Sequence, residues 1–116
     1  MPAARLRNAT TGQVIAEHVE YADTWWKRFA GFIPKREVLP DDGLWFRDCW
    51  AIHTLGMRAR IDVIFLDAEL RVLKTERGVA LHRPIVSCMG ARNVVELGAG
   101  ALEGRDVLVG DRLTLE

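Results

Sequence analysis

The sequence predicts a mainly β protein, either a compact β-sandwich or a partly closed barrel, with one short helix. Short apolar runs alternate with polar residues along most of the chain, and turn residues separate these runs at near-regular spacing. One segment alone has the period of a helix. A chain of 116 residues has the length of one domain, so we expect a single domain over residues 1–116.

Residues 4 to 20 are expected to contribute two strands joined by a turn. Thr10-Thr11-Gly12 favours the turn, because Gly accepts positive φ and hydroxyl side chains bond to nearby backbone groups. From Gln13 to Glu20 the side chains alternate between two faces, which is the period of a strand.

The period then changes to that of a helix. Trp25, Phe29 and Phe32 fall at i, i+4 and i+7, on one face of a helix. The carboxylate of Asp23 can accept a hydrogen bond from the first turn as an N-cap. We therefore expect a short helix from about Thr24 to Ala30, with its aromatic stripe in the core.

The longest apolar block, residues 49 to 67, is expected to form the middle of the β structure. Ala51 to Leu55 alternates and is rich in residues that favour strands. Ile61 to Leu66 is nearly continuous apolar after Asp62, which indicates a strand covered on both faces. We expect these two strands to adjoin, with residues 56–60 connecting them.

Further strands are expected on both sides of this block. Asp67-Ala68-Glu69 has the residues of a turn, which predicts a hairpin between the strands that flank it. Residues 78–89 are weakly patterned, and Pro84 predicts that part of this stretch is an edge strand or a loop. The other expected strands cover residues 44–46, 70–76, 93–97, 107–109 and 113–115, with a turn at Gly110-Asp111.

Charge and composition narrow the function classes. The 16 basic and 16 acidic residues cancel, so the chain lacks the positive surface of a nucleic-acid-binding protein, and we expect no such partner. No apolar run has the length of a signal peptide or a membrane span, which predicts a cytoplasmic protein with no membrane partner. In that compartment Cys49 and Cys88 are expected to be free thiols.

Cys49, His53 and Met57 share one face if the central block is a strand. Their side chains suit copper(I) or zinc, and a Cys–His pair could provide a nucleophile. Residues four apart on a strand are roughly 13 Å apart, whereas metal ligands must lie within about 2.3 Å of one ion. The spacing therefore predicts packed side chains, no metal and no cofactor. A pairing of Cys88 with His53 stays open.

Asp62 is the most unusual residue of the block, because a carboxylate in an apolar strand is costly unless it is paired or hydrogen-bonded. If His53 and Asp62 lie on adjacent strands of a hairpin, one side chain could orient the other. Two interpretations stay open: a buried ion pair that fixes the strand register, and a cleft for a small polar or anionic ligand. The candidate partners of Asp62 are Arg28, Arg58, Arg60, Arg83 and His53.

Several short motifs follow one another in a recognisable order after about residue 20. They are Arg28 to Phe32, Gly43 to Phe46, Ile52 to Met57, Ile61 to Asp67, Val95 to Leu97 with Gly100, and Gly110-Asp111. This ordered set resembles DUF192, a bacterial and archaeal domain family of unknown function. The resemblance implies a small, mostly β sandwich or barrel and no settled activity. Many members carry Phe-Trp-Met-Lys-Asn-Thr where this chain has Ile-His-Thr, so no role is carried over to His53.

We therefore expect a non-enzymatic binding or accessory module, with a shallow polar cleft near His53 and Asp62 that holds a small polar ligand or a protein segment. One alternative is a hydrolase or transferase with His53 as general base. Another is an oligomeric structural component that buries Trp26 or Trp50 between subunits. The residues expected to bind the ligand are Arg28, His53, Thr54, Asp62 and Arg83.

Overall fold

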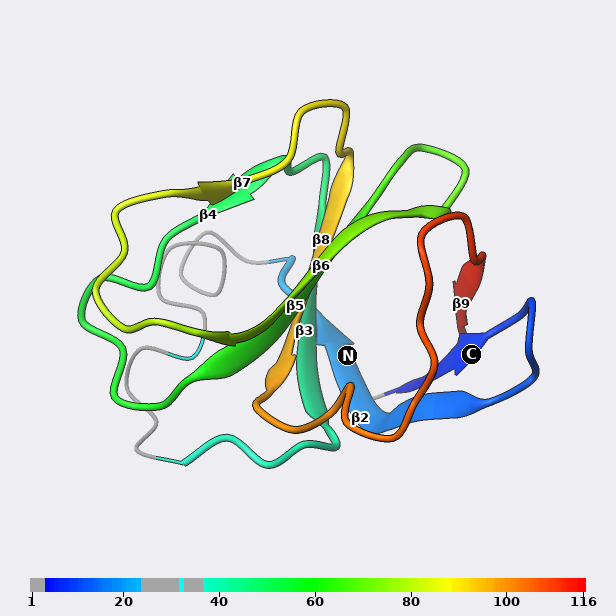
Figure 1. Ribbon diagram of the computed structural model, residues 1–116, viewed down its shortest axis with the longest axis horizontal. Helices are drawn as coiled ribbons and strands as arrows, with labels where there is room; N and C mark the ends of the chain where they lie inside the picture. The colour runs from blue at the N-terminus through cyan, green and yellow to red at the C-terminus, as the bar shows by residue number, and fades with distance from the viewer. Residues whose placement is uncertain (1–3, 24–31, 33–36) are drawn as a thin grey trace.

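Nine strands make up the regular structure of the residues that the computed structural model describes, which are 4–23, 32 and 37–116 (Figure 1). The strands are β1 (Ala4–Asn8), β2 (Val14–Tyr21), β3 (Asp42–Arg47), β4 (Ala51–Ile52), β5 (Ile61–Leu66), β6 (Val72–Val79), β7 (Val86–Ser87), β8 (Asn93–Gly98) and β9 (Leu113–Leu115). The described residues contain no helix. The helix expected over residues 24–30 lies outside them.

Seven of the described strands form one mixed sheet in the order β6-β5-β8-β3-β2-β1-β9. Of the neighbouring pairs in this sheet, β2 and β3 run parallel and the others run antiparallel. The two edges meet at one end, where Arg71 and Arg112 form a β-bridge and the N–H of Val72 donates to the carbonyl of Asp111 at 2.8 Å. The sheet therefore curls into a partly closed barrel, which confirms the predicted fold class.

The curled sheet has two apolar faces, each with its own core. The inner core receives side chains from all seven strands, among them Leu6, Trp45 and Leu97. The outer core lies on the opposite face of β3, β5, β6 and β8 and includes Phe46 and Val63. Because both faces of β5 are covered, this strand is buried along its whole length, as predicted.

An antiparallel ribbon, formed by residues 49–54 and 82–92, contributes side chains to the outer core. At its centre β4 and β7 form a separate two-stranded sheet. The prediction that a strand over residues 51–55 adjoins β5 is therefore wrong, because β6 and β8 occupy both edges of β5. The strand is also shorter than predicted and ends at Ile52.

The other predicted strands are confirmed, including the hairpin of β5 and β6, with one exception. Residues 107–109 do not form a strand, because the chain turns around a buried carboxylate. The N–H of Leu108 donates to Oδ2 of Asp111 at 3.0 Å, and the amide of Asn8 donates to the same oxygen at 2.8 Å. These bonds hold the pKa of Asp111 below its ordinary value.

No helix of the described part of the chain has the length and apolar character that crossing a membrane requires.

Candidate functional site

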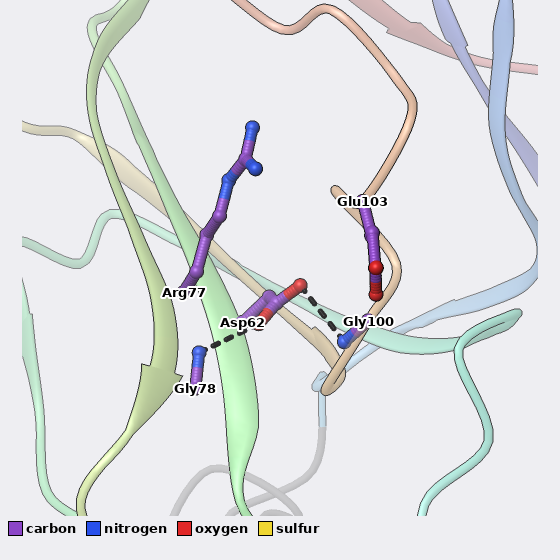
Figure 2. A pocket seen from close by; sticks show the side chains of 5 residues that line it. All are labelled: Asp62, Arg77, Gly78, Gly100 and Glu103. Atoms are coloured by element: carbon purple, nitrogen blue, oxygen red, sulfur yellow. Dashed lines mark hydrogen bonds between the residues drawn. The ribbon is translucent and has the colours of Figure 1, made fainter.

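Asp62 lies near the start of β5 and faces the inner side of the curled sheet. Its register partner on β8 is Leu97, an inner-core residue, and Asp62 is 1% exposed. The carboxylate accepts backbone hydrogen bonds from Gly78 (2.8 Å) and Gly100 (3.2 Å), which Figure 2 shows, and from Leu102 (3.1 Å). Backbone donors therefore satisfy this buried group, and no arginine of the described residues forms the buried ion pair expected in one interpretation of Asp62.

A β-bulge and a turn bring these donors to the carboxylate. Ile61 pairs with Val79 but Val63 pairs with Glu76, so an extra residue of β6 lies opposite Asp62. Two of the donors are glycines with positive φ, 54° at position 78 and 95° at position 100. Since glycine adopts positive φ without steric penalty, it allows both N–H groups to turn toward Asp62.

A cleft lies beside the Asp62 carboxylate, between the end of β6 and the turn that follows β8. We call it the Asp62 cleft; its volume is about 350 Å³, and it is lined by Asp62, Arg77, Gly78, Gly100 and Glu103. Figure 2 shows Arg77 and Glu103 on opposite sides of Asp62. Both side chains are exposed, and within the described part of the chain neither forms an ion pair or a side-chain hydrogen bond.

Glu96 is a second buried acidic residue, on the neighbouring strand β8 but on the outer face. Its cross-strand neighbours are Val63 on β5 and Leu44 on β3, both of the outer core. Glu96 is 4% exposed, and its Oε1 is buried without a hydrogen-bond partner. Burial raises the pKa of Glu96 to about 8. The side chain is therefore a neutral carboxylic acid at pH 7.

The segment before β3 closes the outer face near Glu96. A Cβ at position 98 would overlap the backbone of Val38 and Leu39, so Gly98 is required for this close crossing. Gly98 and Glu96 are two residues apart on one strand and therefore share a face. The crossing segment, with Val38 in the outer core, helps to exclude water from the carboxyl group.

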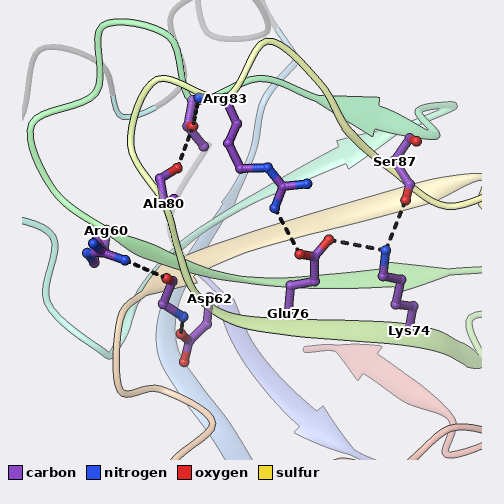
Figure 3. A network of polar contacts seen from close by, with 9 residues as sticks. Arg60, Asp62, Lys74, Glu76, Ala80, Arg83 and Ser87 are labelled. Carbon is purple, nitrogen blue, oxygen red and sulfur yellow. Dashed lines mark hydrogen bonds and ion pairs between the residues drawn. The ribbon is translucent and has the colours of Figure 1, made fainter.

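A polar network on β6 links the sheet to the ribbon (Figure 3). Glu76 forms ion pairs with Arg83 (3.0 Å) and Lys74 (3.2 Å), and Lys74 also donates to the carbonyl of Ser87 at 3.3 Å. Burial raises the pKa of Glu76, but the hydrogen bond from Arg83 and the ion pair with Lys74 outweigh burial and hold the pKa below its ordinary value. In contrast to Glu96, this acidic residue is matched by two cations.

Thr54 and Arg83 are the predicted ligand-binding residues that the fold brings together. The hydroxyl of Thr54 donates to the carbonyl of Ala80 at 2.8 Å and accepts from the N–H of Arg83 at 2.8 Å. Thr54 is 1% exposed. These contacts give Thr54 a structural role in holding the ribbon, whereas a ligand-binding role for either residue stays a prediction.

His53 and Asp62 are not adjacent partners as predicted. His53 follows β4 in the ribbon, where its Nδ1 is buried without a hydrogen-bond partner. Since β4 pairs with β7 and the Asp62 carboxylate is bonded to backbone groups, the hypothesis that Asp62 orients His53 across a hairpin is wrong. Arg28 lies outside the described residues. The ligand-binding roles of Arg28 and His53 stay predictions.

Three residues, two in the Asp62 cleft and one at the buried carboxyl of the outer face, are not predicted from the sequence. Glu96 carries the same signal as Asp62, an acidic residue within the apolar strand 93–97, so the pattern could have found it. Arg77 and Glu103 lie in stretches where charged residues are ordinary. The fold alone brings these two side chains to one cleft.

Cys49 and Cys88 are both reduced thiols, as predicted, and no disulfide joins them. The thiol of Cys49 donates to the carbonyl of Ala51 at 3.1 Å. Across the described ranges, no group of three or more His, Cys, Asp or Glu residues is arranged to hold a metal ion.

Comparisons with known proteins indicate a family. The family model described as DUF192, "Uncharacterized ACR", matches residues 6–115. The chain is 38% identical over 117 residues to a UPF0127 protein of Pyrococcus furiosus, with 91% of this chain and 93% of that protein covered. It is 37% identical to a UPF0127 protein of Thermococcus gammatolerans, with coverage of 92% and 72%. Neither name states an activity.

Two solved structures share the fold. One is a proposed transcription regulator from Sinorhizobium meliloti, with a TM-score of 0.79, 24% identity, and 98% of this chain and 92% of that chain covered. The other is a protein of unknown function from Novosphingobium aromaticivorans, with a TM-score of 0.79, 18% identity, and coverage of 97% and 83%. At these identities the likeness shows the fold alone.

Proposed function

This chain belongs to the uncharacterised DUF192 family, and on that premise we propose that it is a non-enzymatic binding module that holds a small polar ligand in the Asp62 cleft. One observation carries the proposal: the cleft has a buried carboxylate at its floor and two charged side chains at its rim, Arg77 and Glu103, that form no ion pair with any described residue. Sites for small molecules commonly combine such a concave surface with a few convergent polar groups.

The floor of the cleft supports binding in preference to catalysis. A general base must reach its proton through a free lone pair in a suitable geometry. Asp62 is sealed from solvent, and three backbone N–H groups already bond to it. This arrangement fixes the walls of the cleft, so the direct ligand contacts come from the rim and Asp62 acts on a ligand through its charge. The alternative, a hydrolase or transferase with His53 as general base, would have to work without Asp62 as the group that orients His53.

Nuclear magnetic resonance with three polar probes, glutamine, glucose and succinate, tests the proposal. We expect at least one probe to produce saturable shifts of the backbone N–H signals of Gly78, Gly100 and Leu102. The shifts should weaken at least threefold in the double variant Arg77→Gln/Glu103→Gln. Unchanged binding in this folded variant would remove the proposal.

A cytoplasmic location is part of the same proposal. Its basis is that no apolar run in the sequence has the length of a signal peptide or a membrane span. Fractionation of cells that express the full-length protein, with detection by antibody, tests it. Recovery from the membrane or envelope fraction would contradict it.

A further inference from the structure

We infer that the Asp62 cleft selects a small zwitterion, a molecule that carries one anionic group and one ammonium group. The inference rests on the proposed function and adds the chemical class of the ligand. It follows from the signs of the charges around the cleft, from their separation on two walls, and from the size of the space between them.

Arg77 supplies the position for the anionic group. Its side chain extends along one side of the cleft (Figure 2), and no carboxylate of the described residues pairs with it. A guanidinium can donate two parallel hydrogen bonds to a carboxylate or a phosphate. Arg77 belongs to β6, beside the bulge at Gly78, so its backbone is held by the same hydrogen bond that anchors Asp62.

Glu103 and Asp62 supply the position for the ammonium group. Glu103 projects from the turn on the other side of the cleft, and Asp62 lies between the two walls (Figure 2). The Asp62 carboxylate is matched by backbone N–H groups and by no cation of the described residues. A cationic group at this side therefore meets two acidic residues, one exposed and one buried.

Ligands of one sign fit these charges less well. An anion bound at Arg77 would face the carboxylates of Asp62 and Glu103, and like charges in proximity are unfavourable. A cation bound at Glu103 would leave the guanidinium of Arg77 unpaired. A zwitterion places each charge against its opposite, which makes it the class that the cleft complements.

The size of the cleft limits the ligand to a small molecule. A volume of about 350 Å³ lies at the lower end of the range for ligand pockets, roughly 300–1,000 Å³. The space beside Gly78 is open, since nothing lies within 4 Å of a Cβ built at that position. An amino acid or an amino-carboxylic acid of similar size fits this space.

A matched series of probes tests the inference on the full-length protein. The series is 4-aminobutyrate with butyrate and butylamine, which carry one of its charges each, together with glycine and 6-aminohexanoate, which vary the separation of the charges. Binding is followed by the backbone N–H signals of Gly78, Gly100 and Leu102. We expect at least one zwitterion to bind about fivefold more tightly than butyrate and butylamine, since each exposed ion pair contributes a factor of this order.

Single variants separate the two halves of the site. Arg77→Gln should weaken butyrate and the zwitterion, and Glu103→Gln should weaken butylamine and the zwitterion. Arg58→Gln and Glu69→Gln change exposed charges outside the cleft and should leave binding unchanged. Added salt should reduce the advantage of the zwitterion, because it screens exposed charges.

The outcomes distinguish this inference from the proposed function. If butyrate or butylamine binds as tightly as every zwitterion, as measured from the three N–H signals, the zwitterion class is overturned and a polar-ligand module stands. If none of these probes, nor glutamine, glucose or succinate, shifts the signals, both are overturned. A zwitterion advantage that survives Arg77→Gln and Glu103→Gln unchanged also overturns the inference.

Discussion

Asp62 and Glu96 occupy adjacent strands, and each is a buried acidic residue within an apolar run. Asp62 pairs with Leu97 and Glu96 pairs with Val63, so the two residues lie one register step apart on opposite faces of the same sheet. On the inner face, three backbone N–H groups bond to Asp62. On the outer face, Oε1 of Glu96 has no partner and burial raises the pKa of the residue to about 8.

The difference shows that the backbone around an acidic residue decides its chemistry. Two glycines with positive φ direct N–H groups at Asp62 and shape a cleft beside it. Around Glu96 the nearest strands present Leu44 and Val63, which have no hydrogen-bonding side chains. A carboxylate with donors remains an acceptor, whereas a carboxyl group without donors holds its proton.

Replacing Glu96 by glutamine should produce the largest change in stability. The measured quantity is the free energy of unfolding of the wild type minus that of Glu96→Gln. Between pH 4.5, the ordinary pKa, and about pH 8, the pKa in the folded state, this difference should fall by about 1.4 kcal/mol per pH unit. The sign is negative because the folded state retains a proton that the unfolded state has lost. Above pH 8 the variant should be more stable by on the order of 5 kcal/mol. Urea unfolding at intervals across this pH window measures the difference.

Glu69→Gln is the matched control for this measurement, since Glu69 is exposed. Its stability difference from the wild type should stay flat over the same window. An equally flat difference for Glu96→Gln would mean that burial on the outer face does not raise the pKa of Glu96.

Replacing Asp62 by asparagine tests the hydrogen bonds of the inner face. An amide offers one acceptor oxygen and directs an NH₂ group toward backbone donors, so at least one buried N–H loses its partner. We expect a loss of about 3 kcal/mol in the free energy of unfolding, together with weaker hydrogen-exchange protection at Gly78, Gly100 and Leu102. Protection equal to that of the wild type would show that these N–H groups do not depend on the carboxylate.

Replacing Thr54 by valine should have a smaller effect, confined to the ribbon. Valine keeps the shape of threonine but removes the bonds to the Ala80 carbonyl and the Arg83 N–H. A loss of about 1–2 kcal/mol is expected. Hydrogen exchange should accelerate at Arg83, and the N–H of Leu102 in the Asp62 cleft should be unaffected. Acceleration at both sites would mean that the two regions are not separate.

The smallest effect is expected for Glu76→Gln, with the opposite pH dependence to Glu96→Gln. Because Arg83 and Lys74 hold the pKa of Glu76 below its ordinary value of 4.5, its contribution is present above that pH and is lost as the pH falls below it. The wild type should exceed the variant by less than about 1 kcal/mol at neutral pH. Acid titrations of unfolding for both proteins measure the difference, and a gap that widens toward low pH would contradict it.

Sequence patterns predict the β class and most strands here because alternation and turn residues are local properties. The pairing of 49–54 with 82–92 depends on which strand edges stay free, and this is a property of the whole sheet. Asp62 stands out in the sequence, but its donors at Gly78 and Gly100 come from distant segments. Glu96 carries the same local signal, and only its surroundings in the fold distinguish its chemistry.

The most direct test of this account is a pH titration of the Glu96 side-chain carboxyl carbon by nuclear magnetic resonance. The Glu96→Gln variant identifies the signal, and the exposed Glu69 serves as internal reference. The midpoint for Glu96 should lie at about pH 8. A midpoint near the ordinary value of 4.5 would contradict it, because the outer face would then solvate or pair the charge as the inner face does.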